Sequence, residues 1–158
     1  MATVFDSPRN LLGKEGQALD TSAWLTIDQQ RIDQFAEVTG DRQWIHVDPV
    51  RARSGPFGST IAHGYLTVAL VNLLLPEIIE VRNVSMGVNI GVDGLRFLAP
   101  VAVGSRIRAT GIIVKVNEVK AGAIQCVVRV TVEIAGKEKP ACVLDTISRY
   151  YPGEADDG

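Results

Sequence analysis

The strongest constraint on the fold is an apolar run between Ile61 and Leu75, which is long enough for a helix and is followed by Pro76. A few polar residues interrupt the run, which falls short of the ~18 apolar residues that a membrane-spanning helix needs. A helix that is apolar almost all round packs against protein on most sides. We therefore expect a helix over 61–75 in the middle of the fold, and we expect no membrane insertion.

The second half of the chain changes to a sequence period of two. Between Ile124 and Ile134 apolar and polar residues alternate, which is typical of half-buried antiparallel strands. Further strands are expected over 84–90, 95–98, 106–116 and 141–150, with turns at 91–94, 121–122 and 136–137. One buried helix followed by long strands predicts an α+β domain in which a curved antiparallel sheet wraps a long central helix.

Length and composition indicate one domain and exclude several classes of function. A chain of 158 residues that is 46% hydrophobic forms one ordinary domain, expected over 1–151, with a disordered tail at 152–158. The net charge of -2 and pI near 5.7 provide no basic field for nucleic acid. The N-terminus lacks a secretory pattern, so we expect a cytoplasmic protein whose Cys126 and Cys142 are buried thiols.

A shorter helix and a long loop precede the apolar run. Thr26 and Gln29 match a helix capping box, and apolar residues then recur at helical spacing until Gly40. Turn-forming residues crowd the stretch 40–59, where we expect one short helical turn near 49–53. Long loops inside compact domains commonly carry function, so this stretch is the place to look for a site.

Both histidines of the chain, His46 and His63, lie in or just beyond this loop. Taken singly, His46 is an ordinary imidazole with a satisfied hydrogen bond, and Asp41 is the second residue of a Gly-Asp turn. A metal site made from Asp41, His46, Asp48 and His63 has suitable ligand types. It lacks histidines paired at helical spacing and cysteine ligands, so we expect no metal.

Three segments carry a resemblance to a known family. Residues 40–49 resemble the hydratase signature Asp-x-Asn-Pro-Leu-His followed by Asp-Pro. Residues 55–64 resemble the segment that leads into the central helix of the MaoC-like dehydratases, including nodulation-protein-N-like members. Residues 91–104 resemble the family's strand entering the sheet. The positions that match the signature are Asp41, His46, Asp48 and Pro49. Gln43-Trp44-Ile45 replaces the usual Asn-Pro-Leu, which bears on the rigidity of the loop that aims the histidine.

The resemblance implies a hot-dog fold, a homodimer, and hydration of trans-2-enoyl-CoA to (R)-3-hydroxyacyl-CoA in fatty-acid metabolism. Such an enzyme is a lyase that needs no cofactor, because coenzyme A is part of the substrate. Coenzyme A and acyl carrier protein both stay open as the thioester carrier. The alternatives are a hot-dog acyl-CoA thioesterase and a non-catalytic dimer that binds acyl thioesters, because one fold can host several chemistries.

Hydration of an enoyl thioester needs a base, a proton donor and stabilisation of charge on the thioester oxygen. Asp41 and His46 are the candidates for base and donor, and which residue does which stays open. At reference pKa values of about 3.9 and 6.5, an aspartate and a histidine can both accept hydrogens from one water at pH 7. Gly64 is the candidate oxyanion donor through its backbone N–H, since the N-terminus of a helix has free N–H groups.

Other residues are assigned supporting roles. We expect Asn72, which stands where relatives have a serine, and His63 to form hydrogen bonds that steady the site. The helix carries a leucine stripe that is either core or the lining of an acyl tunnel: Leu66, Leu70, Leu73 and Leu74. Scattered arginines either bind the phosphates of coenzyme A or lie in solvent: Arg51, Arg53, Arg82 and Arg96.

Overall fold

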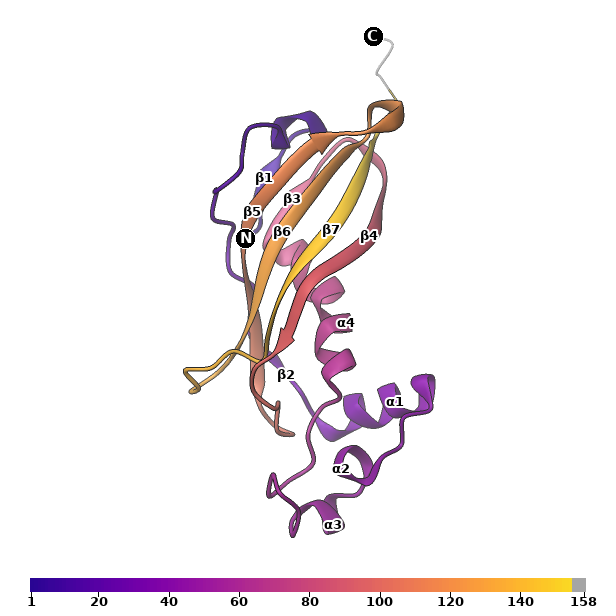
Figure 1. The fold of residues 1–158 in the computed structure, drawn as a ribbon, viewed down its shortest axis with the longest axis vertical. Helices are drawn as coiled ribbons and strands as arrows, with labels where there is room; N and C mark the ends of the chain where they lie inside the picture. Colours follow the sequence, from indigo (N-terminus) through magenta and orange to yellow (C-terminus); the bar gives the residue numbers. More distant parts are fainter. Residues whose placement is uncertain (155–158) are drawn as a thin grey trace.

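The computed structural model describes residues 1–154, which form a curled five-stranded sheet with a helix lying against it (Figure 1). The sheet order is β2-β5-β6-β7-β4, and all neighbours are antiparallel. Its strands are β2 (Leu25–Thr26), β4 (Val84–Phe97), β5 (Arg106–Glu118), β6 (Ile124–Ile134) and β7 (Cys142–Pro152). The predicted α+β architecture, a curved sheet around a central helix, is confirmed.

Four α-helices accompany the sheet in the described part of the chain. They are α1 (Gln29–Thr39), α2 (Trp44–Val47), α3 (Pro49–Ala52) and α4 (Gly64–Leu74). Helix α4 lies along the sheet, whereas α1, α2 and α3 gather beyond one end of it (Figure 1). Among residues 1–154, no helix is long and apolar enough to cross a membrane.

The remaining elements are short. They are the parallel pair β1 (Thr3–Phe5) and β3 (Ile79–Val81), and the 3-10 helices η1 (Pro8–Leu11), η2 (Leu75–Glu77) and η3 (Lys120–Gly122). The sequence did not predict β1, β2 or β3, because two or three residues are too few to show a period.

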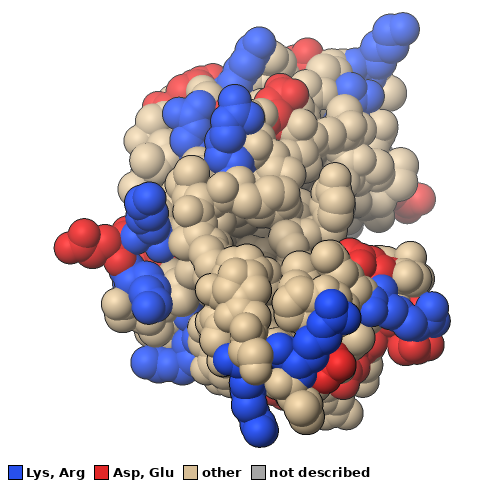
Figure 2. Space-filling view, turned by 60° about the horizontal axis from the view of Figure 1, so that its bottom comes forward, with Lys and Arg blue, Asp and Glu red and all other residues tan. Residues whose placement is uncertain are grey.

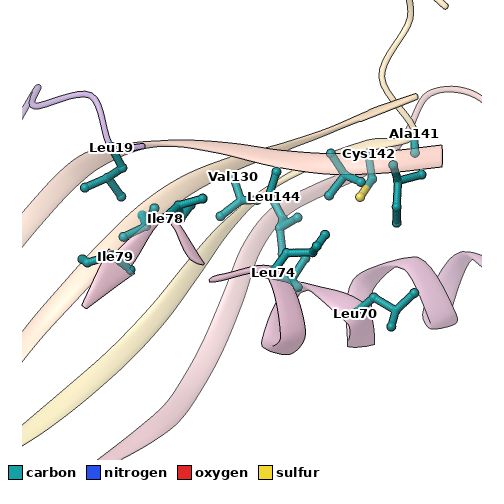
Figure 3. Close-up of a cluster of buried hydrophobic side chains, with 14 of the residues drawn as sticks. Leu19, Leu70, Leu74, Ile78, Ile79, Val130, Ala141, Cys142 and Leu144 are labelled. Carbon is teal, nitrogen blue, oxygen red and sulfur yellow. The ribbon is translucent and has the colours of Figure 1, made fainter. Parts of the chain in front are cut away.

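The core fills the space between the sheet and α4. Every second residue is buried along the whole of β6, over 107–113 of β5 and over 142–148 of β7, as the period of two predicted. Leu70 and Leu74 of α4 lie against this face, where Figure 3 also shows Val130 and Leu144. Cys126 and Cys142 are both free and buried, as expected. Burial raises the pKa of the Cys126 thiol to about 12.

Strand β4 differs from the prediction of two strands separated by a turn at 91–94. The strand continues through these glycines and shifts register between Asn89 and Gly91 and between Asp93 and Arg96. Gly94 has a φ of +61°, a conformation that glycine adopts without strain. Bulges of this kind bend a strand without ending it, so the glycines mark irregularity inside β4.

Three helix predictions need correction. The N-cap of α1 is Asp28, whose carboxylate accepts from the Arg31 N–H at 2.8 Å, so the capping box at Thr26 is wrong. Helix α4 begins at Gly64 because Ile61 and the residue after it are extended and bond to neighbouring segments. The helical turn expected near 49–53 is confirmed as α3, but the prediction of a single turn in the stretch 40–59 missed α2 at 44–47.

The C-terminal end is ordered further than expected. Pro152 is the last residue of β7, and the Gly153 N–H donates to the Asn83 carbonyl at 2.8 Å. The predicted disordered tail therefore does not begin at 152. Residues 155–158 lie outside the described part of the chain.

Candidate active site

Asp41 is presented by the turn that ends α1. Gly40 has a φ of +82° and caps the helix, and the Asp41 N–H then donates to Thr39 Oγ1 at 3.3 Å. One carboxylate oxygen of Asp41, Oδ1, accepts from the Gln43 N–H at 3.3 Å. The other oxygen, Oδ2, has no hydrogen-bond partner within residues 1–154 and faces His46. The turn thus fixes the carboxylate while leaving one oxygen available.

His46 lies on α2 and is 6% exposed. Its Nδ1 is 2.7 Å from the Ile61 carbonyl oxygen. A carbonyl oxygen can only accept, so Nδ1 carries the hydrogen and the neutral ring has its lone pair on Nε2. That nitrogen is 4.0 Å from Asp41 Oδ2.

The two acceptors are spaced for one water molecule. A water oxygen placed about 2.8 Å from both His46 Nε2 and Asp41 Oδ2, which are 4.0 Å apart, makes an angle close to 90° with these two atoms. This angle is near the H–O–H angle of water, so each O–H can point at one acceptor. Burial lowers the pKa of His46, and the neighbouring His63 lowers it further, against the opposing effects of the Ile61 carbonyl and Asp41. A lowered pKa keeps Nε2 free to accept at neutral pH.

His63 contacts both His46 and Asp41. Its ring stacks on that of His46 with centroids 3.8 Å apart and 21° between the planes. Its Nε2 donates to the Asp41 carbonyl oxygen at 2.9 Å, and Phe35 packs against the ring edge with centroids 5.0 Å apart. The predicted hydrogen bond of His63 is present. Its Nδ1 is buried and has no hydrogen-bond partner among the described residues.

The ring geometry does not suit a metal ion. The ligand atoms of Asp41, His46 and His63 lie within 4.8 Å of one another, which is close enough to consider a site. A metal ion lies in the plane of each histidine ring that binds it, at about 2.0–2.1 Å for zinc. Two nearly parallel rings 3.8 Å apart aim their lone pairs into separate planes, so chelation would require one ring to rotate. Asp48 is engaged elsewhere, as the cap of α3.

Gly64 is the first residue of α4, as the site prediction requires. No side chain caps this helix end, and within residues 1–154 the Gly64 N–H has no hydrogen-bond partner. A Cβ atom added at Gly64 would lie 2.9 Å from the Phe97 ring. A larger residue at 64 would therefore displace the half-exposed Phe97 ring. Gly64 and Phe97 both line an apolar hollow of about 410 Å³.

Asn72 does not join the cluster. It lies eight residues beyond Gly64, which is roughly 12 Å along a helix at 1.5 Å per residue. Its Oδ1 accepts from Asn89 Nδ2 on β4 at 3.1 Å. Among the described residues Asn72 therefore bonds to β4 and not to the loop that carries Asp41 and His46, and its expected support of that loop stays a prediction.

Gln29 is a site residue that the sequence did not reveal. Its Nε2 donates to the His46 carbonyl oxygen at 2.7 Å, and its Oε1 accepts from Thr60 Oγ1. Gln29 thus joins α1, the helix that carries His46 and the segment that leads into α4. Its match to a capping box concealed this role, and nothing else in the sequence indicated it.

The scattered arginines take separate positions. The guanidinium of Arg51 lies 4.3 Å from the Trp44 ring centroid, and Arg82 pairs with Glu80 at 2.9 Å. Arg96 bonds to the adjacent carbonyl of Leu95. On the leucine stripe, Leu66, Leu70 and Leu74 are buried, whereas Leu73 is 48% exposed.

The architecture is that of the hot-dog fold. The structure superposes on the (R)-hydratase from A. caviae involved in PHA biosynthesis with a TM-score of 0.68, covering 85% of this chain and 94% of that one at 21% identity. The sequence profile of the MaoC like domain matches residues 11–136. The chain therefore belongs to the MaoC-like dehydratase family.

Two curated relatives are similar over most of their length. 3-hydroxyacyl-thioester dehydratase Z of Mycobacterium tuberculosis is 47% identical over 147 residues, covering 93% of this chain and 97% of the relative. Nodulation protein N of Rhizobium meliloti is 42% identical over 135 residues, covering 84% of each chain.

Proposed function

We propose that this protein is an (R)-specific enoyl-CoA hydratase, which adds water reversibly to trans-2-enoyl-CoA to give (R)-3-hydroxyacyl-CoA. The observation that carries the proposal is the 4.0 Å separation of Asp41 Oδ2 and His46 Nε2. Membership of a dehydratase family and similarity to a 3-hydroxyacyl-thioester dehydratase support a hydratase or dehydratase function. Catalysis lowers the barrier for both directions, so the same site serves hydration and dehydration.

The pair would act on a single water. One hydrogen of that water is donated to Asp41 Oδ2 and the other to His46 Nε2, which leaves an oxygen lone pair for C3 of the enoyl group. As the C3–O bond forms, one O–H bond breaks and its proton passes to the pair, which returns it to C2. Both additions then occur on one face of the double bond, and such acid–base assistance contributes roughly 10²–10⁴-fold.

Gly64 would stabilise the charge that develops in this reaction. The π electrons of the double bond move toward the thioester carbonyl while C3 is attacked, so its oxygen becomes negative until C2 is protonated. A free N–H at the start of an eleven-residue helix is a suitable donor to such an oxygen. The apolar hollow beside Gly64 would hold the acyl thioester.

The test of the function separates hydration from thioester cleavage. Crotonyl-CoA is mixed with purified protein, and the absorbance of the conjugated thioester is followed together with free thiol. We expect absorbance loss without thiol release, reduced roughly 10²–10⁴-fold in Asp41→Asn and His46→Gln variants that melt like the parent. Thiol release would instead identify a thioesterase, and no change on short or long enoyl chains would favour a binding protein.

We also propose that the protein is a homodimer that pairs through β4. This strand is at the edge of the sheet, and none of its fourteen residues is buried. The exposed apolar residues of β4 and the neighbouring face of α4 are Met86, Val88, Ile90, Val92, Phe97, Tyr65 and Leu73. An edge strand with exposed apolar side chains promotes association, and a symmetric dimer is the commonest closed arrangement.

Light scattering during size exclusion tests the dimer. Val88→Lys on β4 should shift the mass toward the monomer, because the charge would be buried between copies. Ile112→Lys on β5 is the matched control, since Ile112 is also an exposed apolar strand residue, at 47% exposure against 38% for Val88. A parent protein of monomer mass, or an equal effect of the two variants, would contradict pairing through β4.

A further inference from the structure

Three hollows follow one another across the end of the molecule that holds the candidate site. The apolar hollow beside Gly64 shares Ile61, Ala99 and Pro100 with a second hollow of about 640 Å³. That hollow in turn shares residues of the β6–β7 hairpin, Lys137 among them, with a third hollow of about 360 Å³. In Figure 2 this end of the molecule is hollowed, with an uncharged surface inside and both basic and acidic side chains around it.

The lining of the hollows changes from apolar to charged along this series. The first hollow is lined by apolar side chains together with Thr67, whereas the second reaches Ser105, Lys137 and Lys139. The third is lined by Trp24 and Arg108 as well as Lys137. This order matches a ligand whose acyl end is apolar and whose far end carries negative charge.

Trp24 is the residue that sets the third hollow apart. Its side chain is 37% exposed although two guanidinium groups lie over it, that of Arg108 at 4.3 Å from the ring centroid and that of Arg106 at 5.4 Å. Arg108 is fixed by Glu133 at 2.7 Å. An exposed indole beside cations is the combination that binds a nucleobase together with its phosphates.

The charge around Trp24 is positive in a chain whose net charge is negative. Glu133 is committed to Arg108, whereas Arg106, Lys137 and Lys139 have no ion-pair partner within residues 1–154. Glu138 is the one further carboxylate that lines this hairpin hollow. The surplus of cations favours a ligand with several phosphate groups.

We propose that Trp24, Arg106, Arg108, Lys137 and Lys139 form the binding site for the nucleotide end of coenzyme A. The adenine contacts Trp24 and the phosphates contact the surrounding cations, while the pantetheine arm follows the second hollow toward Gly64. The proposal rests on the proposed function, which names coenzyme A as the carrier, and adds the site where the nucleotide end of that carrier binds. An acyl carrier protein would not use this site, because its arm has no nucleotide.

The first test uses tryptophan emission and does not depend on turnover. Trp44→Phe leaves Trp24 as the single tryptophan of the chain. Coenzyme A and adenosine 3′,5′-bisphosphate should both change the emission of this variant, and pantetheine should not. No response to either nucleotide, or an equal response to pantetheine, would overturn the assignment whether or not the protein is a hydratase.

The second test compares substrates with and without the nucleotide. In Lys137→Glu/Lys139→Glu, KM for crotonyl-CoA should rise roughly 5- to 100-fold with kcat unchanged, while KM for crotonyl-pantetheine stays the same. Trp24→Ala should act in the same direction. Lys115→Glu/Lys120→Glu makes the same charge change on other exposed lysines and should change neither KM. An equal rise for both substrates, or an equal effect of the control, contradicts the site, and turnover of crotonyl-pantetheine tests the hydratase separately.

Discussion

The site segment, residues 29–63, and the sheet core, formed by β5, β6, β7 and α4, are held together in different ways. Within the site segment Ile32 and Ala36 are buried, but the two histidines are positioned by single hydrogen bonds to carbonyl oxygens, from His46 to Ile61 and from His63 to Asp41. The sheet core depends on the burial of alternating apolar side chains. Burial is large and non-directional, whereas a hydrogen bond fixes one distance and one angle. Activity and stability should therefore respond to different substitutions.

The largest effect is expected in the sheet core. Leu74→Ala removes a side chain that is 1% exposed, so it should lower the free energy of unfolding by about 2–5 kcal/mol. Folded Leu74→Ala protein should convert crotonyl-CoA at the parent's rate at low temperature, because Leu74 lies far along α4 from Gly64. Denaturant unfolding and initial rates measure the two quantities. Val38→Ala, at an 85% exposed position, is the control and should change stability by less than about 0.5 kcal/mol.

Substitution of Gln29 tests whether polar contacts hold the site segment in place. Gln29→Leu leaves the His46 carbonyl and the Thr60 hydroxyl without their partner, which should cost about 1–3 kcal/mol of stability. The rate should fall as well, because α2 would lose its connection to α1. The matched control is Gln30→Leu, an exposed glutamine on the same helix. Equal behaviour of the two variants would show that the bridge has no role.

Two substitutions of His63 separate the effect of its ring stack on His46 from the effect of its hydrogen bond to Asp41. Phe at this position keeps a ring to stack on His46 but cannot donate to Asp41, whereas Gln keeps a donor but no ring. His63→Phe should lower kcat by roughly 10- to 100-fold through displacement of Asp41. His63→Gln should recover much of that loss, and KM should change less than kcat. If kcat fell in both variants only in proportion to their loss of thermal stability, the role of His63 would be purely structural.

The smallest effect concerns pH. The pKa of His46 is about 6.5 in the unfolded chain, and burial lowers this pKa in the folded protein. Between these two values the unfolded state binds more protons, so stability falls as the pH drops below about 6.5 and stops falling below the folded pKa. The slope from one histidine cannot exceed about 1.4 kcal/mol per pH unit. On acidification the melting temperature of the parent should therefore fall more than that of His46→Gln. An equal fall in both proteins would contradict the lowered pKa.

The sequence by itself determined the class of fold and the central pair. The period of two over 124–134 and the apolar run before Pro76 predicted a sheet around a helix, because side-chain periodicity reports directly which face is buried. The match at Asp41 and His46 predicted that these two residues act together, and the structure places Asp41 Oδ2 4.0 Å from His46 Nε2. Their catalytic role stays a prediction. The glycines of β4 were misread as a turn, since a bulge and a turn have the same local composition.

Tertiary structure alone decided how the pair is aimed and what surrounds it. The Ile61 carbonyl selects the His46 tautomer, and Gln29 bridges three segments, yet neither contact leaves a pattern in the sequence. Trp24 and Lys137 are more than a hundred residues apart in the chain and line one hollow. Local sequence encodes which surfaces are buried, but contacts between distant segments exist only after that burial has brought them together.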